Sequence, residues 1–100
     1  MKPENPKIKL VDGAKVRNRH IDFALGGHHW RYPWIPASEV WVERILRGCD
    51  RAATVVHELA EVKAMRRGLG YDEAHKLANG VERRYRRRVC SRGTKNNLTP

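Results

Sequence analysis

The chain has 100 residues, of which 40% are hydrophobic and 32% charged, and its formal net charge is +10 at pH 7. This length fits one small domain with a core of limited size, so a metal, a partner or a second copy would help to stabilise it. No stretch approaches the ~20 apolar residues that cross a membrane, and we therefore expect no membrane partner.

The cysteine content favours a reducing environment. Cys49 and Cys90 are the two cysteines, which is too few for a disulfide framework, and the N-terminal residues lack the apolar segment of a secretion signal. We therefore expect reduced thiols and a cytoplasmic location, with a single Cys49–Cys90 bridge as the alternative.

The N-terminal part of the chain has the pattern of short extended segments. Residues 1–6 contain two prolines and polar side chains, and we expect them to be disordered. Alternating apolar residues predict a strand or extended arm around Ile8 to Leu10, followed by a turn at Asp12-Gly13. The same spacing predicts a second strand over residues 20–25, which Gly26-Gly27 would end.

The next segment, residues 28–36, is too rich in proline and aromatic residues for a helix and predicts an ordered loop. Its histidines, His28 and His29, could bring imidazoles to a site, but a loop that covers the sheet is the favoured interpretation. Residues 38–45 alternate again and predict a third strand, with a short helix as the alternative.

Two helices are predicted after this strand. Asp50 is a good N-cap for the first, which extends to about residue 65 or 69. Gly68 to Tyr71 should separate the helices, and Asp72 can cap the second. The apolar stripe of the first helix consists of Val55, Leu59, Val62 and Leu69, and that of the second consists of Ala74, Leu77, Ala78, Val81 and Tyr85.

These elements predict an α+β fold, in which short N-terminal strands or an extended arm pack on a C-terminal antiparallel helical hairpin. We expect one domain over residues 7–90 and a frayed polar tail over residues 91–100.

The strongest chemical signal is the sequence His57-Glu58-Leu59-Ala60-Glu61 in the first helix. His57 and Glu61 are four residues apart, so they lie on one face of the helix and can share a divalent metal. His75 and Glu82 are seven residues apart on the second helix and border the face that should meet the first.

Two ligand sets remain open at this point. His57, Glu61 and His75 provide two imidazoles and one carboxylate, which is a ligand set of catalytic zinc sites. Replacing His75 by Glu82 gives a harder, oxygen-rich set that suits manganese or iron. Glu82 could also be a fourth ligand, and zinc is the favoured metal.

A metal at this position would lower the pKa of a bound water, and Glu58 is placed to accept its proton as the general base of a hydrolase. Two alternatives involve no catalysis. The metal could only stabilise a small core. The histidine and glutamates could instead belong to an ordinary charged helix.

The motif His57-Glu58-Leu59-x-Glu61, with Gly68, Tyr71, His75 and Glu82 after it, resembles a group of small uncharacterised bacterial and phage-borne proteins. These in turn resemble minimal zincin-type metallopeptidases, so the resemblance implies a short sheet before an active-site helix. It also implies that Val40-Trp41-Val42-Glu43 is an edge strand that pairs with a peptide substrate. The chain departs from zincins at Glu61, where these usually have a second histidine.

The basic C-terminal end suggests a different function. Residues 83–100 contain seven Lys or Arg and no acidic residue. Five arginines fall within six residues: Arg83, Arg84, Arg86, Arg87 and Arg88. Such a cluster can neutralise phosphates, and the alternative function is therefore a non-enzymatic module that binds nucleic acid through this helix.

Overall fold

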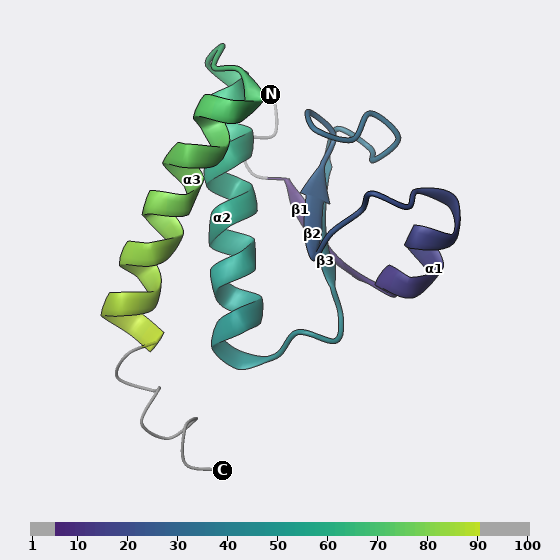
Figure 1. Ribbon diagram of the computed structural model, residues 1–100, viewed down its shortest axis with the longest axis horizontal. Coiled ribbons are helices and arrows are strands. Elements are labelled where there is room, and N and C mark those ends of the chain that lie inside the picture. The colour runs from purple at the N-terminus through teal and green to yellow at the C-terminus, as the bar shows by residue number, and fades with distance from the viewer. Residues whose placement is uncertain (1–5, 91–100) are drawn as a thin grey trace.

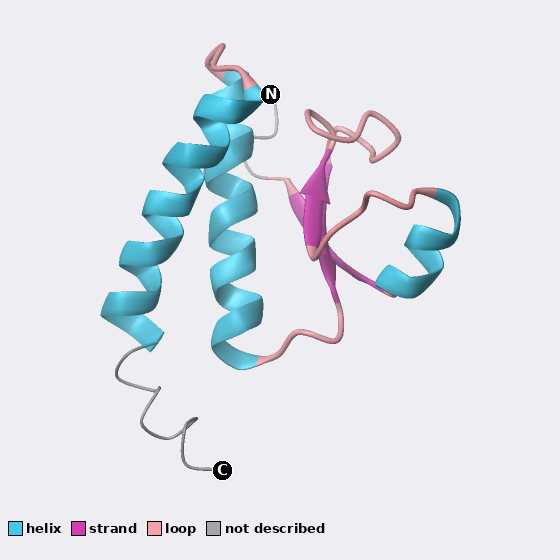
Figure 2. Ribbon diagram, in the orientation of Figure 1, coloured by secondary structure: helices cyan, strands magenta, loops and turns pink. Residues whose placement is uncertain are grey.

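A computed structural model describes residues 6–90, and over this range the chain forms a three-stranded sheet and three α-helices (Figures 1 and 2). The elements in chain order are β1 (Lys7–Val11), α1 (Gly13–Arg19), β2 (Gly26–His28), β3 (Glu39–Glu43), α2 (Gly48–Arg66), α3 (Tyr71–Tyr85) and the π-helical turn η1 (Arg86–Cys90). The predicted α+β class is confirmed. Of residues 1–6, which are predicted to be disordered, all but Pro6 lie outside the described residues, as does the frayed tail predicted for residues 91–100.

The segment between β1 and β2 differs from its prediction. Where a turn and a second strand were expected, the chain forms helix α1, because the Asp12 side chain accepts two backbone N–H groups of the first turn. Residues 20–25 are not a strand. Of their alternating apolar residues only Phe23 is buried, whereas Ile21 is 85% exposed. The strand lies instead at Gly26–His28, within the segment expected to be a turn and loop.

The start of each long helix also differs. The N-cap of α2 is Arg47 and that of α3 is Gly70, and neither makes a side-chain capping bond. Asp50, predicted as a cap, lies inside α2, where its carboxylate accepts a hydrogen bond from Arg86 at 3.0 Å. Asp72 lies in the first turn of α3, where its negative charge interacts favourably with the positive end of the helix dipole.

The sheet has β3 at its centre, with β1 parallel to it on one side and β2 antiparallel on the other. Val40 pairs with Ile8 of β1 and with His28 of β2. Val40–Glu43 is therefore not an edge strand, and the expected pairing of a peptide along it is wrong. Both of its hydrogen-bonding sides are used within the sheet, and β2 is the edge strand next to α2 (Figure 1).

The two faces of the sheet contribute to two different cores, because side chains of a strand alternate between faces. On one face the fully buried Val40 and Val42 pack against Val62 of α2. On the other face Trp41 packs against a cluster formed by Val11, Phe23, Tyr32 and Ile35. The alternation predicted for β3 is thus confirmed, and it fixes which side of the sheet faces the helices.

Helices α2 and α3 form the predicted antiparallel hairpin, with α2 between α3 and the sheet (Figure 2). Gly68, with φ of 106°, provides the left-handed residue that ends α2. Buried alanines allow the helices to approach closely: Ala53, Ala64, Ala74 and Ala78. Such an approach is what the site described below requires.

A disulfide joins Cys49 and Cys90, so the structure realises the bridge that the composition left as the alternative to reduced thiols. It links the first turn of α2 to the end of η1 and closes the open end of the hairpin. The cytoplasmic location stays a prediction. Within residues 6–90, none of the helices combines the length and apolar character needed to cross a membrane.

Because Gly27 has no side chain, β2 can lie close to the loop that follows this strand and contains Tyr32. A Cβ atom at this position would lie 2.6 Å from two ring carbons of Tyr32, which is itself buried. A methyl group therefore requires the strand or the ring to move.

We predict that Gly27→Ala lowers the free energy of unfolding by about 1–3 kcal/mol, the usual cost of overpacking. Gly80→Ala is the matched control, since it lies inside α3 with only a flexible Arg84 atom at 3.7 Å. This change should stabilise the protein by about 0.5–1 kcal/mol. Urea denaturation measures both, and equal effects of the two substitutions would contradict the close approach at Gly27.

Candidate metal centre

The predicted ligands gather in a cavity of about 240 Å³, formed where β2, α2 and α3 meet. Helix α2 contributes His57, Glu58 and Glu61, and α3 contributes His75 and Glu82. The backbone of Gly26 and Gly27 forms the side that belongs to the sheet. Residues far apart in sequence thus surround one small space.

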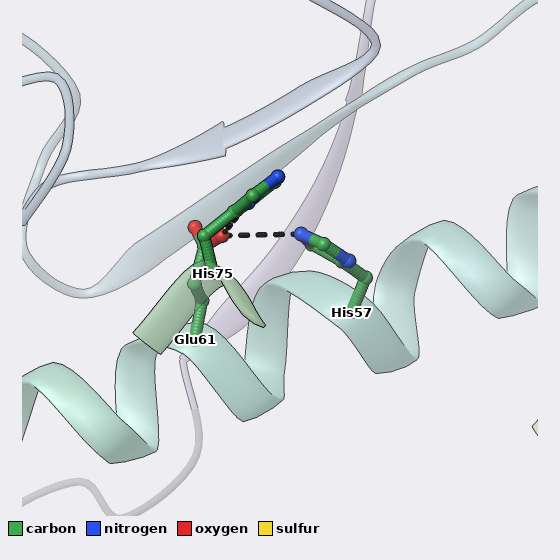
Figure 3. A group of neighbouring side chains, drawn as sticks. All are labelled: His57, Glu61 and His75. Atoms are coloured by element: carbon green, nitrogen blue, oxygen red, sulfur yellow. Dashed lines mark hydrogen bonds and ion pairs between the residues drawn. The ribbon is translucent and has the colours of Figure 1, made fainter. Parts of the chain in front are cut away.

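The carboxylate of Glu61 is the centre of this cluster, and its residue is only 2% exposed. Its Oε2 lies 3.1 Å from Nε2 of His57 and 2.6 Å from Nδ1 of His75 (Figure 3). Its Oε1 lies 2.7 Å from Nε2 of His28. Three imidazoles from three different elements therefore share one carboxylate.

The contact between His75 and Glu61 depends on the register of the hairpin. If the turn centres near residue 70, counting along two antiparallel helices puts His75 level with Met65, about one turn away from Glu61 along the helix axis. The observed packing brings His75 to Glu61 directly. The rings of His57 and His75 lie 5.0 Å apart, so the two predicted imidazoles face the same carboxylate oxygen.

His28 is the residue of the cluster that sequence reasoning did not choose. It was placed in a covering loop, but it lies on β2, is 1% exposed and reaches Glu61. Its Nδ1 accepts the backbone N–H of Arg31 at 3.3 Å, so its proton is on Nε2, and His28 donates to Glu61. The neighbouring His29 points elsewhere and contacts the carbonyl of Ile35. The preceding Gly26-Gly27, which allows a close backbone approach, was the available signal.

Glu82 contacts His57 rather than the Glu61 side of the cluster. Its Oε1 lies 3.0 Å from Nδ1 of His57, and its Oε2 accepts a hydrogen bond from Arg86 at 2.9 Å. This carboxylate therefore orients the His57 ring and directs Nε2 towards Glu61. The hydrogen bond to Glu61 raises the pKa of His57, against the opposing effect of burial.

The two glutamates of α2 have opposite electrostatic character. Burial raises the pKa of Glu58 to about 8, and the nearby charge of Glu61 adds to this shift. Burial alone would also raise the pKa of Glu61, but the hydrogen bonds from His28, His57 and His75 hold it well below its usual range. Of these two glutamates, Glu61 is therefore the ionised one in the metal-free protein.

The donor atoms fit a divalent cation. One ligand atom each from His57, Glu61 and His75 lie within 4.8 Å of one another. Two imidazoles and a carboxylate are a set that zinc accepts in catalytic sites. His28, Glu58 and Glu61 form a second group at the same spacing. The first group fits zinc better, because it has two imidazoles and one carboxylate, whereas the second has one imidazole and two carboxylates and is a harder set.

The predicted basic cluster is divided by the structure. Arg86 is turned towards the protein and pairs with Glu82 and Asp50. These two hydrogen bonds raise the pKa of its guanidinium. The remaining four arginines are exposed and follow one another at spacings of one, three and one residues: Arg83, Arg84, Arg87 and Arg88.

No protein family, curated protein or solved structure matches this chain. The resemblance to small zincin-type proteins therefore stays a prediction.

Glu58 gives the metal-free protein a defined dependence of stability on pH. A pKa raised from 4.5 to about 8 by folding means that protonated Glu58 contributes stability below pH 4.5. This contribution is lost as the pH rises through about 8. With a chelator present, we predict that wild-type stability relative to Glu58→Gln falls by about 2–4 kcal/mol between about pH 5 and about pH 9.

The control for this experiment is Glu73→Gln, which changes an exposed carboxylate in the first turn of α3. The difference in free energy of unfolding between this variant and the wild type should stay constant over the same pH range. Urea denaturation at each pH provides the free energies of unfolding. Parallel curves for wild type and Glu58→Gln would contradict the buried, protonated state of Glu58.

Proposed function

We propose that this chain is a metal-dependent hydrolase that cleaves amide bonds, with zinc held by His57, Glu61 and His75. The observation that supports the proposal is the convergence of these three side chains in a cavity next to the buried Glu58. The metal is a proposal from the chemistry of the donor set, and manganese or iron is the alternative.

The residues around the ligands have separate roles in this proposal. Glu82 holds His57 by its Nδ1, and His28 holds the Glu61 carboxylate by one oxygen, so that the other oxygen is directed to His57 and His75. Such partners keep ligands oriented and commonly affect metal affinity. Zinc in such a site acts as a Lewis acid and makes water a stronger acid near neutral pH. A bound cation would favour the ionised form of Glu58, which would then accept the proton of a water molecule and return it to the leaving amine.

The first prediction from this proposal concerns metal content. Protein purified without a histidine tag should contain about one zinc per chain by elemental mass spectrometry. Glu61→Gln keeps the size of the side chain but removes its charge, and it should lose the metal. Glu73→Gln is again the control and should keep it. A folded wild-type chain that holds no metal and does not respond to added zinc would overturn the proposal.

The second prediction separates metal binding from catalysis. Glu58→Gln should retain its zinc, because Glu58 is not in the proposed ligand set, but lose about 100-fold or more in hydrolysis of a peptide mixture. Mass spectrometry of the products measures the loss. If the wild-type chain loses thermal stability on chelation but cleaves no peptide with zinc bound, the metal has only a structural role.

The exposed arginines support a second candidate function, which is binding to nucleic acid. Arg83 and Arg87, and likewise Arg84 and Arg88, are four residues apart and form one exposed face over the end of α3 and η1. Such a face can neutralise several phosphates without any metal.

This alternative predicts binding to a 20-mer RNA that weakens steeply with salt. Changing Arg83, Arg84, Arg87 and Arg88 to Ser should lower affinity at ~50 mM salt by about 100-fold and flatten the salt dependence. Arg86 is left unchanged because it pairs with Glu82 and Asp50. Equal affinity of wild type and variant, measured by fluorescence anisotropy, would exclude this face.

A further inference from the structure

Arg31 lines the same cavity, and its charge is not used by the proposed mechanism. The residue is exposed, and its guanidinium carbon lies 4.5 Å from the ring centre of Tyr71 and 5.2 Å from that of Tyr32. Its backbone N–H donates to the carbonyl and to Nδ1 of His28. Both ends of this residue are therefore held in place beside the candidate metal centre.

The guanidinium has no carboxylate partner within the part of the chain that the structure describes. Arg17, Arg44 and Arg86 each form an ion pair with an acidic side chain, whereas no carboxylate of residues 6–90 forms one with Arg31. Two of the three glutamates that line the cavity are already engaged. Glu61 contacts three histidines, and Glu82 contacts His57 and Arg86.

Stacking on tyrosine rings fixes the plane of the guanidinium and leaves its N–H groups at the edge available. A planar fork of donors is suited to a carboxylate, which it binds through two parallel hydrogen bonds. The position of Arg31 at the rim of the cavity means that such a carboxylate would have to come from a bound molecule.

The Tyr71 ring lies between Arg31 and the proposed ligand His75. It contacts both the Arg31 guanidinium and the His75 ring, whose centroid lies 5.3 Å from that of Tyr71. Its hydroxyl lies 3.3 Å from Nδ1 of His75. The guanidinium is therefore roughly 10 Å or less from the His75 ring, a length that about three extended residues span at ~3.4 Å each.

We propose that Arg31 binds a carboxylate of the substrate and that the chain acts on peptides with a negative group within about three residues of the cleaved bond. This inference rests on the proposed function, because it names the class of substrate for the same site. The carboxylate has two sources, a free C-terminus or the side chain of Asp or Glu, and both present the same group to Arg31.

The test measures equilibrium binding, so that it does not depend on turnover. Three acetylated tripeptides are titrated into zinc-loaded protein and followed by NMR: Ac-Ala-Ala-Ala with a free C-terminus, its C-terminal amide, and the amide of Ac-Ala-Asp-Ala. We expect at least one of the two carboxylate peptides to bind about tenfold more tightly than the neutral amide. Which of them does so identifies the source of the carboxylate.

Variants assign this preference to Arg31. Arg31→Gln should abolish it, whereas Arg31→Lys should keep only part of it, because Lys has a charge but no planar fork. Arg67→Gln is the control: it removes the same charge from the exposed turn between α2 and α3, and the preference should remain. If Arg31→Gln does not fold, the comparison of ligands on the wild-type chain still decides the question.

The outcomes separate this inference from the proposed function. Equal binding, or no binding, of the three peptides to a chain that holds one zinc overturns the role of Arg31 and leaves the metal centre intact. If the chain holds no zinc, the proposed function fails, and the same titration is made on the metal-free protein. Arg31 is not a proposed ligand, so its preference for a carboxylate must persist there, and its loss overturns the inference.

Discussion

The burial of the Glu61 carboxylate is the constraint on which the arrangement of the site depends. An ionised group that is 2% exposed is costly unless it is paired, and here imidazoles of His28, His57 and His75 surround it. Each of these histidines comes from a different element. His57 lies on the same helix as Glu61, His75 lies on the next helix, and His28 lies on the edge strand of the sheet. The carboxylate therefore connects all three elements, and any metal that replaces its hydrogen bonds would occupy the junction between them.

Small residues make this junction sterically feasible. Gly26 and Gly27 allow β2 to lie against α2, because a Cβ at Gly26 would come within 3.1 Å of the Glu58 carboxylate. Ala74 and Ala78 play a similar part on α3, where both are fully buried. At the far end, the Cys49–Cys90 disulfide and the pairing of Arg86 with Asp50 join the start of α2 to the end of the hairpin. The hairpin is thus fixed at both ends around its polar centre.

The polar groups of the cavity differ in their freedom to interact with a bound molecule. Glu61 and Glu82 are committed to histidines, Arg86 is committed to two carboxylates, and Glu58 is buried without such a set of donors. The guanidinium of Arg31 contacts two aromatic faces and forms no ion pair with a carboxylate of residues 6–90. A site for hydrolysis needs this division between groups that are fixed and groups that remain available to the substrate. Of the arginines in residues 83–88, Arg86 alone lines the cavity, and the other four form a separate exposed surface.

The sequence by itself determined the helical hairpin and most of the cluster, because helical periodicity places His57 with Glu61 and the apolar stripe on the other face. It also determined β3, whose alternation places Val40 and Val42 on one face and Trp41 on the other. Only the tertiary structure decided that β3 is central, that His75 reaches Glu61 and that Glu82 serves His57 instead. His28 and Arg31 belong to this second group. Strand order, helix register and the approach of a loop depend on contacts between distant residues, and no local pattern in the chain encodes them.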